Sequence, residues 1–416
     1  MDLVRDLNQN IELNPLARNQ DLFRGSIQTM DKQAIARALL WLHGQSRYPF
    51  PTSIHLNLTL RCIARCAHCK QWTWPSHAEL TTSQLKRLVR IFNSWNVQTI
   101  TFGGGNPLLY DQIVLALQTV HQAGIQVGII SEGIGMSDEL ADAIRRYARW
   151  IRFSLDGPNP EIHDEIRNTS GLFDLVMECI RKLKSRDNQL IIGLNCVVQK
   201  RNLNALSQMI ELAERTGVDI LLFKVPHGED YGGHFLPSVQ EWEQFVKWAQ
   251  SAAGRSCVRT NLSELCDLLG LTFREEDVAR GKPVQSFYVQ KRVHCFAPLF
   301  FLTCDSQGNM YPCDYLQADV RPWGGRYRAL RNEFCLGNVL ENSQQVLDRL
   351  ATLLRNRIHG LPASGYDECG SCTRFCQLNA ALSKLDRHLD SKVINEQAIA
   401  EYFLQAEVNQ FSVNFL

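Results

Sequence analysis

The sequence lacks long hydrophobic runs, and it lacks an excess of charge of either sign. No uninterrupted apolar stretch approaches the roughly 20 residues that cross a bilayer, and residues 1–8 show no apolar core of a signal peptide. The 44 Lys and Arg residues balance 43 Asp and Glu residues, for a net charge of +1, which gives no broad basic surface for nucleic acid or anionic lipid. We therefore expect a cytoplasmic protein with no membrane partner, and nucleic acid is not favoured as a partner.

Cysteine is the residue present in excess, with 14 in a chain of 416 residues. Disulfides rarely persist in the cytoplasm, so metal clusters explain these thiols better than disulfides do. The remaining composition is ordinary, and its 45% hydrophobic residues are enough for a large core in two or three domains.

Three of the cysteines lie within eight residues, in Cys62-Ile-Ala-Arg-Cys66-Ala-His-Cys69, directly after the alternating apolar segment 54–58. Thiolates are preferred ligands of iron–sulfur clusters, and this CxxxCxxC spacing can hold three corners of a cubane and leave one iron open to a small molecule. Two other interpretations stay open. Buried cysteines also serve as small core hydrophobes, and a structural zinc site usually takes four ligands in paired CxxC spacing, for which His68 and His77 lie nearest.

From residue 53 onward, segments that favour strands alternate with segments that favour helices. The predicted strands are 53–58, 97–102, 126–130, 150–155, 189–198 and 219–225, and the predicted helices are 82–95, 111–123, 138–147, 173–185, 203–216 and 239–253. Six β-α units predict an α/β fold in which right-handed crossovers curl a parallel sheet into a partial (β/α)6 TIM-type barrel. The cysteine loop then follows the first strand, at the rim where such barrels place their chemistry.

The regions that flank this barrel are predicted by composition and local pattern. We expect an N-terminal helical segment over 1–50, with an amphipathic helix that Asp31 caps, the barrel over 51–254 and a bridging segment over 255–290. A small cysteine-rich domain with a β-hairpin follows over 291–380, and a C-terminal helix and tail cover 381–416. The hairpin is predicted from two apolar segments that flank a turn at 305–308.

Together these motifs resemble the radical S-adenosylmethionine (SAM) superfamily, in particular its members with a C-terminal SPASM or twitch domain. Four motifs carry the resemblance, which covers about residues 53–376: the cysteine loop, Gly103-Gly-Gly-Asn-Pro107, Cys295-x12-Gly308-x4-Cys313 and Cys369-x2-Cys372-x3-Cys376. The resemblance implies that Cys62, Cys66 and Cys69 bind a [4Fe–4S] cluster whose open iron chelates SAM. Reductive cleavage of SAM then yields a 5′-deoxyadenosyl radical that abstracts hydrogen from the substrate.

The resemblance also implies a set of SAM-binding residues, which are Gly103, Gly104, Gly105, Asn106, Pro107, Ser131, Glu132, Ser154, Asn195 and Lys224. Glycines let the backbone approach a ligand closely. Asn106 stands where the family has a glutamate that accepts a hydrogen bond from the SAM ammonium. A neutral acceptor is weaker than a charged one by roughly 1 kcal/mol. Ser131 and Glu132 are expected near the SAM ribose.

The C-terminal motifs imply one auxiliary [4Fe–4S] cluster, held by Cys295, Cys313 and two of Cys369, Cys372 and Cys376. Cys304 and Cys335 remain as ligands for a possible second auxiliary cluster. Asp314 follows Cys313, where sulfatase-maturating relatives place a proton-accepting acid, so it is a candidate catalytic base. The simplest role for the remaining thiols is in the core, at Cys179, Cys196, Cys257 and Cys266.

The resulting function is a radical SAM enzyme that modifies a ribosomally made peptide by cross-linking, oxidation or epimerisation, with a one-electron donor such as flavodoxin or ferredoxin. The fifty residues before the barrel are expected to be too short for a separate peptide-recognition domain. A small-molecule dehydrogenase, decarboxylase or epimerase of antibiotic or cofactor biosynthesis is therefore an alternative. Asn106 supports a third hypothesis, a cluster-bearing scaffold without SAM chemistry.

Overall fold

A computed structural model describes residues 41, 44, 46–66, 68–69, 78–184, 189–224, 235, 237–253, 255–263, 265–266, 297–313 and 335–358. Its strands form one ten-stranded sheet in the order β10-β9-β8-β1-β2-β3-β4-β5-β6-β7. Their bounds are β1 Ser53–Thr59, β2 Thr99–Gly104, β3 Gln126–Ser131, β4 Trp150–Ser154, β5 Ile191–Val197, β6 Ile220–Lys224, β7 Arg259–Thr260, β8 Phe301–Cys304, β9 Asn309–Tyr311 and β10 Gly337–Asn338.

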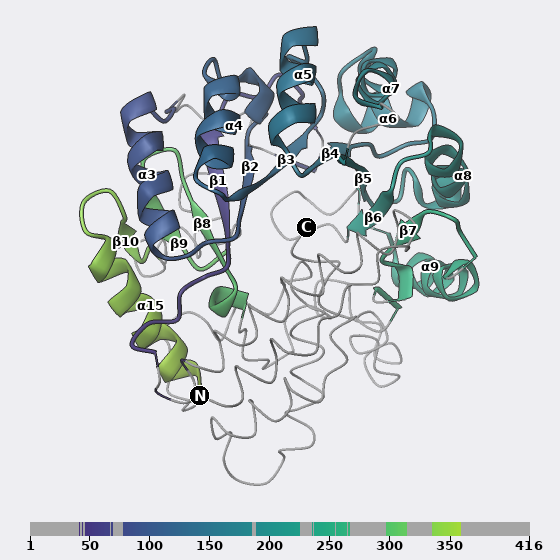
Figure 1. The fold of residues 1–416 in the computed structure, drawn as a ribbon. Coiled ribbons are helices and arrows are strands. Elements are labelled where there is room, and N and C mark those ends of the chain that lie inside the picture. The colour runs from purple at the N-terminus through teal and green to yellow at the C-terminus, as the bar shows by residue number, and fades with distance from the viewer. Residues whose placement is uncertain are drawn as a thin grey trace, which may run out of the picture.

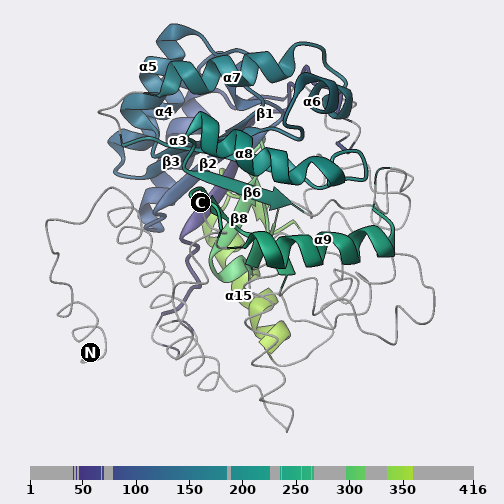
Figure 2. The same cartoon turned by 90° about the vertical axis from the view of Figure 1, so that its right-hand side faces the viewer.

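The α-helices lie on the outside of the curled sheet in Figure 1. Their bounds are α3 Thr82–Ser94, α4 Ile113–Gln122, α5 Asp138–Tyr147, α6 Pro160–Arg167, α7 Leu172–Leu183, α8 Leu206–Thr216, α9 Val239–Ala252 and α15 Ser343–Ile358, with short 3-10 turns η2 Pro107–Leu109, η3 Leu203–Ala205 and η4 Ala297–Leu299. This arrangement confirms the predicted α/β partial barrel. Figure 2 shows the edge where α8 and α9 flank β6, and a hydrogen bond of 2.7 Å from Trp248 Nε1 to Ser207 Oγ joins these two helices.

The six predicted strands and six predicted helices of the barrel all form, with ends that move by three residues or fewer. Local chemistry explains the helix starts. At α3 and α9 the N-cap side chains of Thr81 and Ser238 each form a capping box with the third helical residue, which satisfies two orphan backbone donors. The sequence reading missed α6, although Asn159 caps it and Pro160 occupies its first position.

The predicted hairpin is confirmed as β8 and β9. Asp305 closes its turn, because Oδ1 accepts from the N–H groups of Gln307 and Asn309 at 2.9 Å each, and Gly308 supplies the positive φ that the turn needs. β8 also pairs in parallel with β1, so the hairpin continues the sheet of the barrel. The boundaries of the separate domains stay a prediction.

Every residue of β1 is buried, as expected for a strand covered on both faces. Ile54, Leu56 and Leu58 join the main apolar core, and because side chains alternate along a strand, His55 and Asn57 occupy its other face. Three of the predicted core thiols, Cys179, Cys196 and Cys266, are buried. The prediction for the fourth is wrong: Cys257 is exposed, since it lies in the turn before β7.

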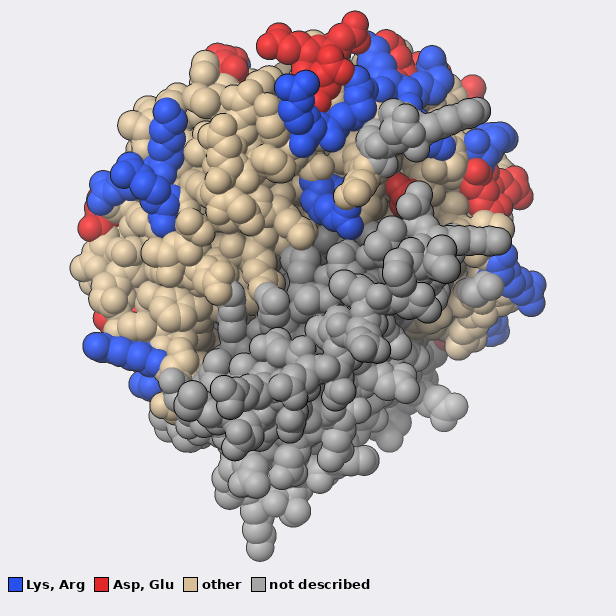
Figure 3. Space-filling view, in the orientation of Figure 1, with Lys and Arg blue, Asp and Glu red and all other residues tan. Residues whose placement is uncertain are grey.

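No helix in the described part of the chain combines the length and apolarity needed to cross a membrane. On the described part of the face in Figure 3, basic and acidic side chains are interspersed. Several predicted features lie outside the described residues: the helix that begins at Asp31, His77, the bridging segment over 267–290, Cys295, Asp314, the cysteines from Cys369 to Cys376, and the C-terminal segment 381–416.

Candidate functional site

The three thiols of the cysteine loop lie together after the C-terminal end of β1. Cys66 is buried, Cys62 and Cys69 are partly buried, and all three join one apolar cluster with Ala64 and Leu172. The Cys69 N–H donates to the Cys66 carbonyl oxygen at 3.2 Å, in a turn that closes the loop. The structure therefore brings together the ligands that the sequence predicts.

Burial disfavours the thiolate form of two of these cysteines. Burial raises the pKa of the Cys62 thiol far above its ordinary value, and Glu132 raises it further. Burial also raises the pKa of Cys66 to about 11, against the opposing charge of Arg167. Thiolates form here only against added positive charge, which iron supplies. Within the described residues, no three His, Cys, Asp or Glu side chains converge on a single metal ion, whereas a cubane takes one thiolate per iron.

The glycines of the 103–107 motif bring β2 against β1 and its loop. A Cβ at Gly103 would lie 2.0 Å from His55 Nε2, and one at Gly105 would lie 2.2 Å from the Arg61 carbonyl oxygen. The Gly105 N–H donates to the Thr59 carbonyl oxygen at 3.0 Å. The close approach that these glycines permit is therefore an approach to the chain itself, and it supports the backbone just before Cys62.

Replacing Gly105 by Ala is expected to destabilise the fold by about 1–3 kcal/mol. The new methyl group would overlap main-chain atoms, which cannot move aside as a side chain can by changing its rotamer. The displaced loop should also bind less iron. Urea unfolding and iron analysis of the anaerobically reconstituted protein measure both effects. Gly124→Ala is the comparison variant: its positive φ makes alanine strained by about 1–2 kcal/mol, but no atom lies within 4 Å of the added Cβ, so it should lose some stability and keep its iron. Full stability and full iron in Gly105→Ala would contradict the prediction.

The Asn106 side chain is fully buried, and both of its polar atoms form hydrogen bonds within the protein. Its Oδ1 accepts from the Leu108 N–H at 3.2 Å and from Ser131 Oγ at 2.8 Å, while Nδ2 donates to the Ile134 carbonyl oxygen at 2.6 Å. Ser131 Oγ in turn accepts from the Gly133 N–H at 2.9 Å. These bonds tie the end of β2 to the loop after β3, and they favour a structural role for Asn106 over contact with a ligand.

The other predicted SAM-binding residues follow neighbouring strands to the same rim. Glu132 is buried after β3, and its Oε1 accepts from Cys62 Sγ at 3.6 Å. Ser154 on β4 stands opposite Asn195 on β5 in the strand register, and Lys224 ends β6. Asn195 Oδ1 is buried with no hydrogen-bond partner among the described residues. Buried acceptors normally have a partner, so this oxygen is a candidate acceptor for a ligand.

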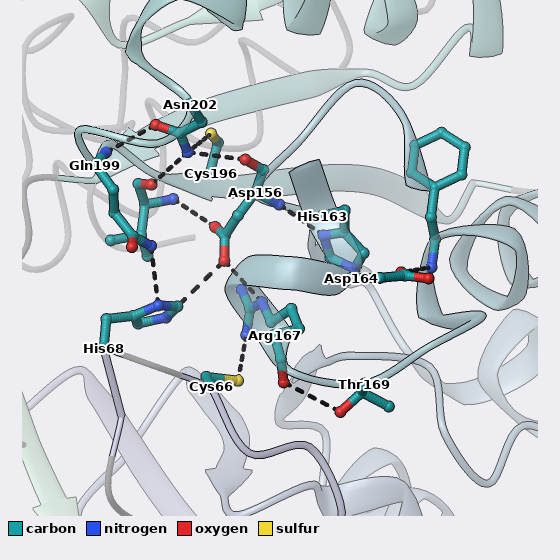
Figure 4. A network of polar contacts seen from close by, with 12 residues as sticks. Cys66, His68, Asp156, His163, Asp164, Arg167, Thr169, Cys196, Gln199 and Asn202 are labelled. Carbon is teal, nitrogen blue, oxygen red and sulfur yellow. Dashed lines mark hydrogen bonds and ion pairs between the residues drawn. The ribbon is translucent and has the colours of Figure 1, made fainter. Parts of the chain in front are cut away.

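A buried polar network that the sequence reading missed connects the cysteine loop to β4, α6 and β5 (Figure 4). At its centre, Asp156 Oδ1 accepts from the Val197 N–H at 2.7 Å and Oδ2 forms an ion pair with Arg167 Nε at 2.7 Å. Asn202 Nδ2 donates to the Asp156 carbonyl oxygen at 2.8 Å, and the Asp156 N–H donates to His163 Nδ1 at 3.0 Å. Burial alone would raise the pKa of Asp156, but Arg167 and the two nearby histidines lower it.

Two contacts link this network to the cysteine loop. Arg167 Nη1 donates to Cys66 Sγ at 3.4 Å, and His68, between the second and third cysteines, contacts Gln199 Nε2 through its Nδ1 at 3.0 Å. Burial lowers the pKa of His68 to about 4, so its ring is neutral at neutral pH. The fixed positive charge beside Cys66 therefore comes from Arg167.

A sequence signal for this network existed. Asp156-Gly157 directly follows a predicted strand, and His163 and Arg167 are four residues apart, which places them on one face of a helix. That spacing carries meaning only if α6 is recognised first.

Of the cysteines expected to bind auxiliary iron, Cys313 and the spare Cys304 and Cys335 are described. Cys304 ends β8, whereas β9 runs antiparallel to β8 and carries the chain back toward Cys313. Cys335 lies just before β10, which pairs with β9 in the antiparallel sense. The strand directions thus place Cys304 at the turn end of the hairpin and Cys313 after its second strand, away from the turn.

A parallel β/α barrel whose first strand leads into three clustered thiols, one buried and two partly buried, defines a class of barrel enzymes that depend on an iron–sulfur cluster. Residues 56–213 match the family model described as "Radical SAM superfamily", so this part of the chain belongs to that superfamily. Membership implies a [4Fe–4S] cluster and SAM, and the donor set described above fits them.

Similar proteins extend the likeness beyond this domain. An AdoMet-dependent heme synthase of Methanosarcina barkeri is 25% identical over 64% of this chain and 77% of its own. The mycofactocin maturase MftC of Mycobacterium tuberculosis is 23% identical over 78% of this chain and 76% of its own. The crystal structure of Streptococcus suis SuiB bound to S-adenosylmethionine covers 95% of this chain and 84% of its own, with a TM-score of 0.58 and 14% identity, so it supports the fold.

Proposed function

We propose that this radical SAM enzyme modifies residues of a ribosomally synthesised peptide. The observation that carries its radical chemistry is the convergence of Cys62, Cys66 and Cys69 at the active rim of the barrel. The peptide substrate is supported by the maturase relative, which aligns over 78% of this chain, and by a SuiB structure with a bound precursor peptide, TM-score 0.54.

The three thiols would hold the cluster, which when bound to SAM supplies the electron that starts radical chemistry. The chain contributes position and environment. Ile134, Leu172 and Leu175 pack against the thiols and exclude water from their surroundings, while Arg167 directs an N–H at Cys66. Ser154, Asn195 and Lys224 supply polar groups at the ends of β4, β5 and β6 for the nucleoside or the substrate.

The proposal includes one auxiliary [4Fe–4S] cluster on Cys295, Cys313 and two of Cys369, Cys372 and Cys376, which would accept an electron from the substrate. We prefer a single cluster, and the strand register supports this choice because it does not pair Cys304 with Cys335. Asp314 would take the proton that the substrate loses on oxidation.

A reducing, cytoplasmic location is supported by the ten cysteines of the described residues, all of which are free thiols.

Anaerobic incubation of the reconstituted enzyme with SAM and dithionite is expected to release 5′-deoxyadenosine, and a peptide extract of the source cells should gain a product of altered mass. Mass spectrometry follows both. Absence of 5′-deoxyadenosine from protein with a full cluster would contradict the radical chemistry and favour a scaffold. Release of 5′-deoxyadenosine without any peptide product would contradict the peptide substrate alone.

A small-molecule substrate is the second candidate, since the heme synthase relative aligns at 25% identity over 64% of the chain. The same incubation with a metabolite extract in place of peptides tests it. A mass change confined to the metabolite fraction would select this candidate.

A further inference from the structure

The carboxylate of Glu132 is buried beside a cluster ligand without a cation of its own. Its side chain is 6% exposed, and its Oε1 accepts from Cys62 Sγ at 3.6 Å. Among the described residues no Lys, Arg or His nitrogen lies within ion-pair distance of it, since the nearby Arg167 is paired with Asp156 at 2.7 Å. Among the described residues, the side-chain donor to Glu132 is thus a thiol.

Iron binding removes that donor. Once Cys62 ligates iron through its sulfur it carries no S–H, so Glu132 Oε1 loses this hydrogen bond. A buried acceptor is retained where a hydrogen-bond donor completes it. The cluster-loaded site therefore presents a buried acid beside Cys62 that a bound cationic donor can complete. The ammonium group of the methionine part of SAM has the required charge and three N–H donors.

Asn106 is poorly placed to serve as this acceptor. Both lone pairs of its Oδ1 are used inside the protein, by the Leu108 N–H and by Ser131 Oγ, and its side chain is fully buried. The hydrogen bond from Ser131 also shows that the loop carrying Glu132 lies against Asn106. A carboxylate is therefore present one strand away from the position where the family resemblance places a glutamate.

We propose that Glu132, at the end of β3, binds the ammonium group of SAM and replaces the missing acid at position 106. Asn106 and Ser131 act as positioning residues that hold the loop of Glu132 against the cysteine loop. This inference rests on SAM binding by the domain and is independent of the peptide substrate in the proposed function.

Equilibrium binding to the anaerobically reconstituted, unreduced enzyme tests the proposal without turnover. Glu132→Gln keeps the shape of the side chain and removes its charge, so the Kd for SAM should rise about tenfold or more, while the iron content stays the same. A SAM analogue that lacks the amino group should bind Glu132→Gln and the unaltered enzyme equally. Glu165→Gln is the matched control, because Glu165 is an exposed glutamate on α6 paired with Arg201, and its Kd for SAM should not change.

An unchanged Kd for SAM in Glu132→Gln would overturn the proposal, and so would an equal loss of affinity for SAM and for the analogue. Should Glu132→Gln load less iron, the isosteric pair Glu132→Asp and Glu132→Asn gives the same comparison of charge. The Asp variant should bind SAM several-fold more tightly than the Asn variant, and equal affinities would refute the role of the carboxylate. No peptide enters these measurements, so failure here leaves the proposed substrate untouched.

Discussion

Replacing Cys62, Cys66 and Cys69 together by Ala is expected to remove about four irons per chain and to abolish SAM cleavage. The three side chains supply the thiolates of one apolar cluster at the end of β1, and no other described cysteine lies in that cluster to replace them. The expected loss of 5′-deoxyadenosine is complete, because the electron that cleaves SAM reaches it only through this site. Iron analysis and chromatography of the products measure the two effects.

Cys257→Ala is the matched control for this triple variant, because Cys257 is an exposed thiol outside the barrel rim. It should keep all of its iron and its SAM cleavage. The triple variant should also keep the iron of the proposed auxiliary cluster. Loss of all iron would contradict separate clusters, and retained SAM cleavage would contradict the assignment of the three thiols.

The barrel was predictable because its signals are local. Each strand from β1 to β6 is a short apolar segment bounded by polar turns, and each paired helix repeats its apolar face with the helical period. The pairing of β8 with β1 was not predictable in this way. The Thr52 hydroxyl donates to the carbonyl oxygen of Phe300, 248 residues further along the chain, and no local pattern specifies such a contact.

The same contrast between local sequence signals and contacts of distant residues applies to the candidate site. Cys62, Cys66 and Cys69 carry their chemistry in their spacing, so the sequence identifies them. The partners of Cys66 come from elsewhere: Arg167 belongs to α6, and the Asp156 that orients it follows β4. The role of Asn106 shows the opposite effect, since its position in the motif suggests a ligand contact whereas its hydrogen bonds lie within the protein.

Arg167→Met is expected to destabilise the protein by about 3–5 kcal/mol, because it leaves the Asp156 carboxylate buried without its counter-charge. This is a large part of the 5–15 kcal/mol that holds a typical domain together. Urea unfolding measures the change in the free energy of unfolding. Arg201→Met is the matched control. Arg201 pairs with Glu165, which lies on α6 like Arg167, but both side chains are about half exposed. The free energy of unfolding should therefore fall by about 1 kcal/mol or less.

The double variant Arg167→Met with Asp156→Asn separates the ion pair from the hydrogen bond to Cys66. It removes one positive and one negative charge, and Asn at position 156 can still accept from the Val197 N–H, so most of the lost stability should return. The N–H donated to Cys66 Sγ is absent in this variant. Because hydrogen bonds to ligand sulfur stabilise the reduced, more negative cluster, its reduction potential should become more negative. Redox titration followed by electron paramagnetic resonance measures that potential, and an unchanged value would show that the contact between Arg167 and Cys66 has no influence on the cluster.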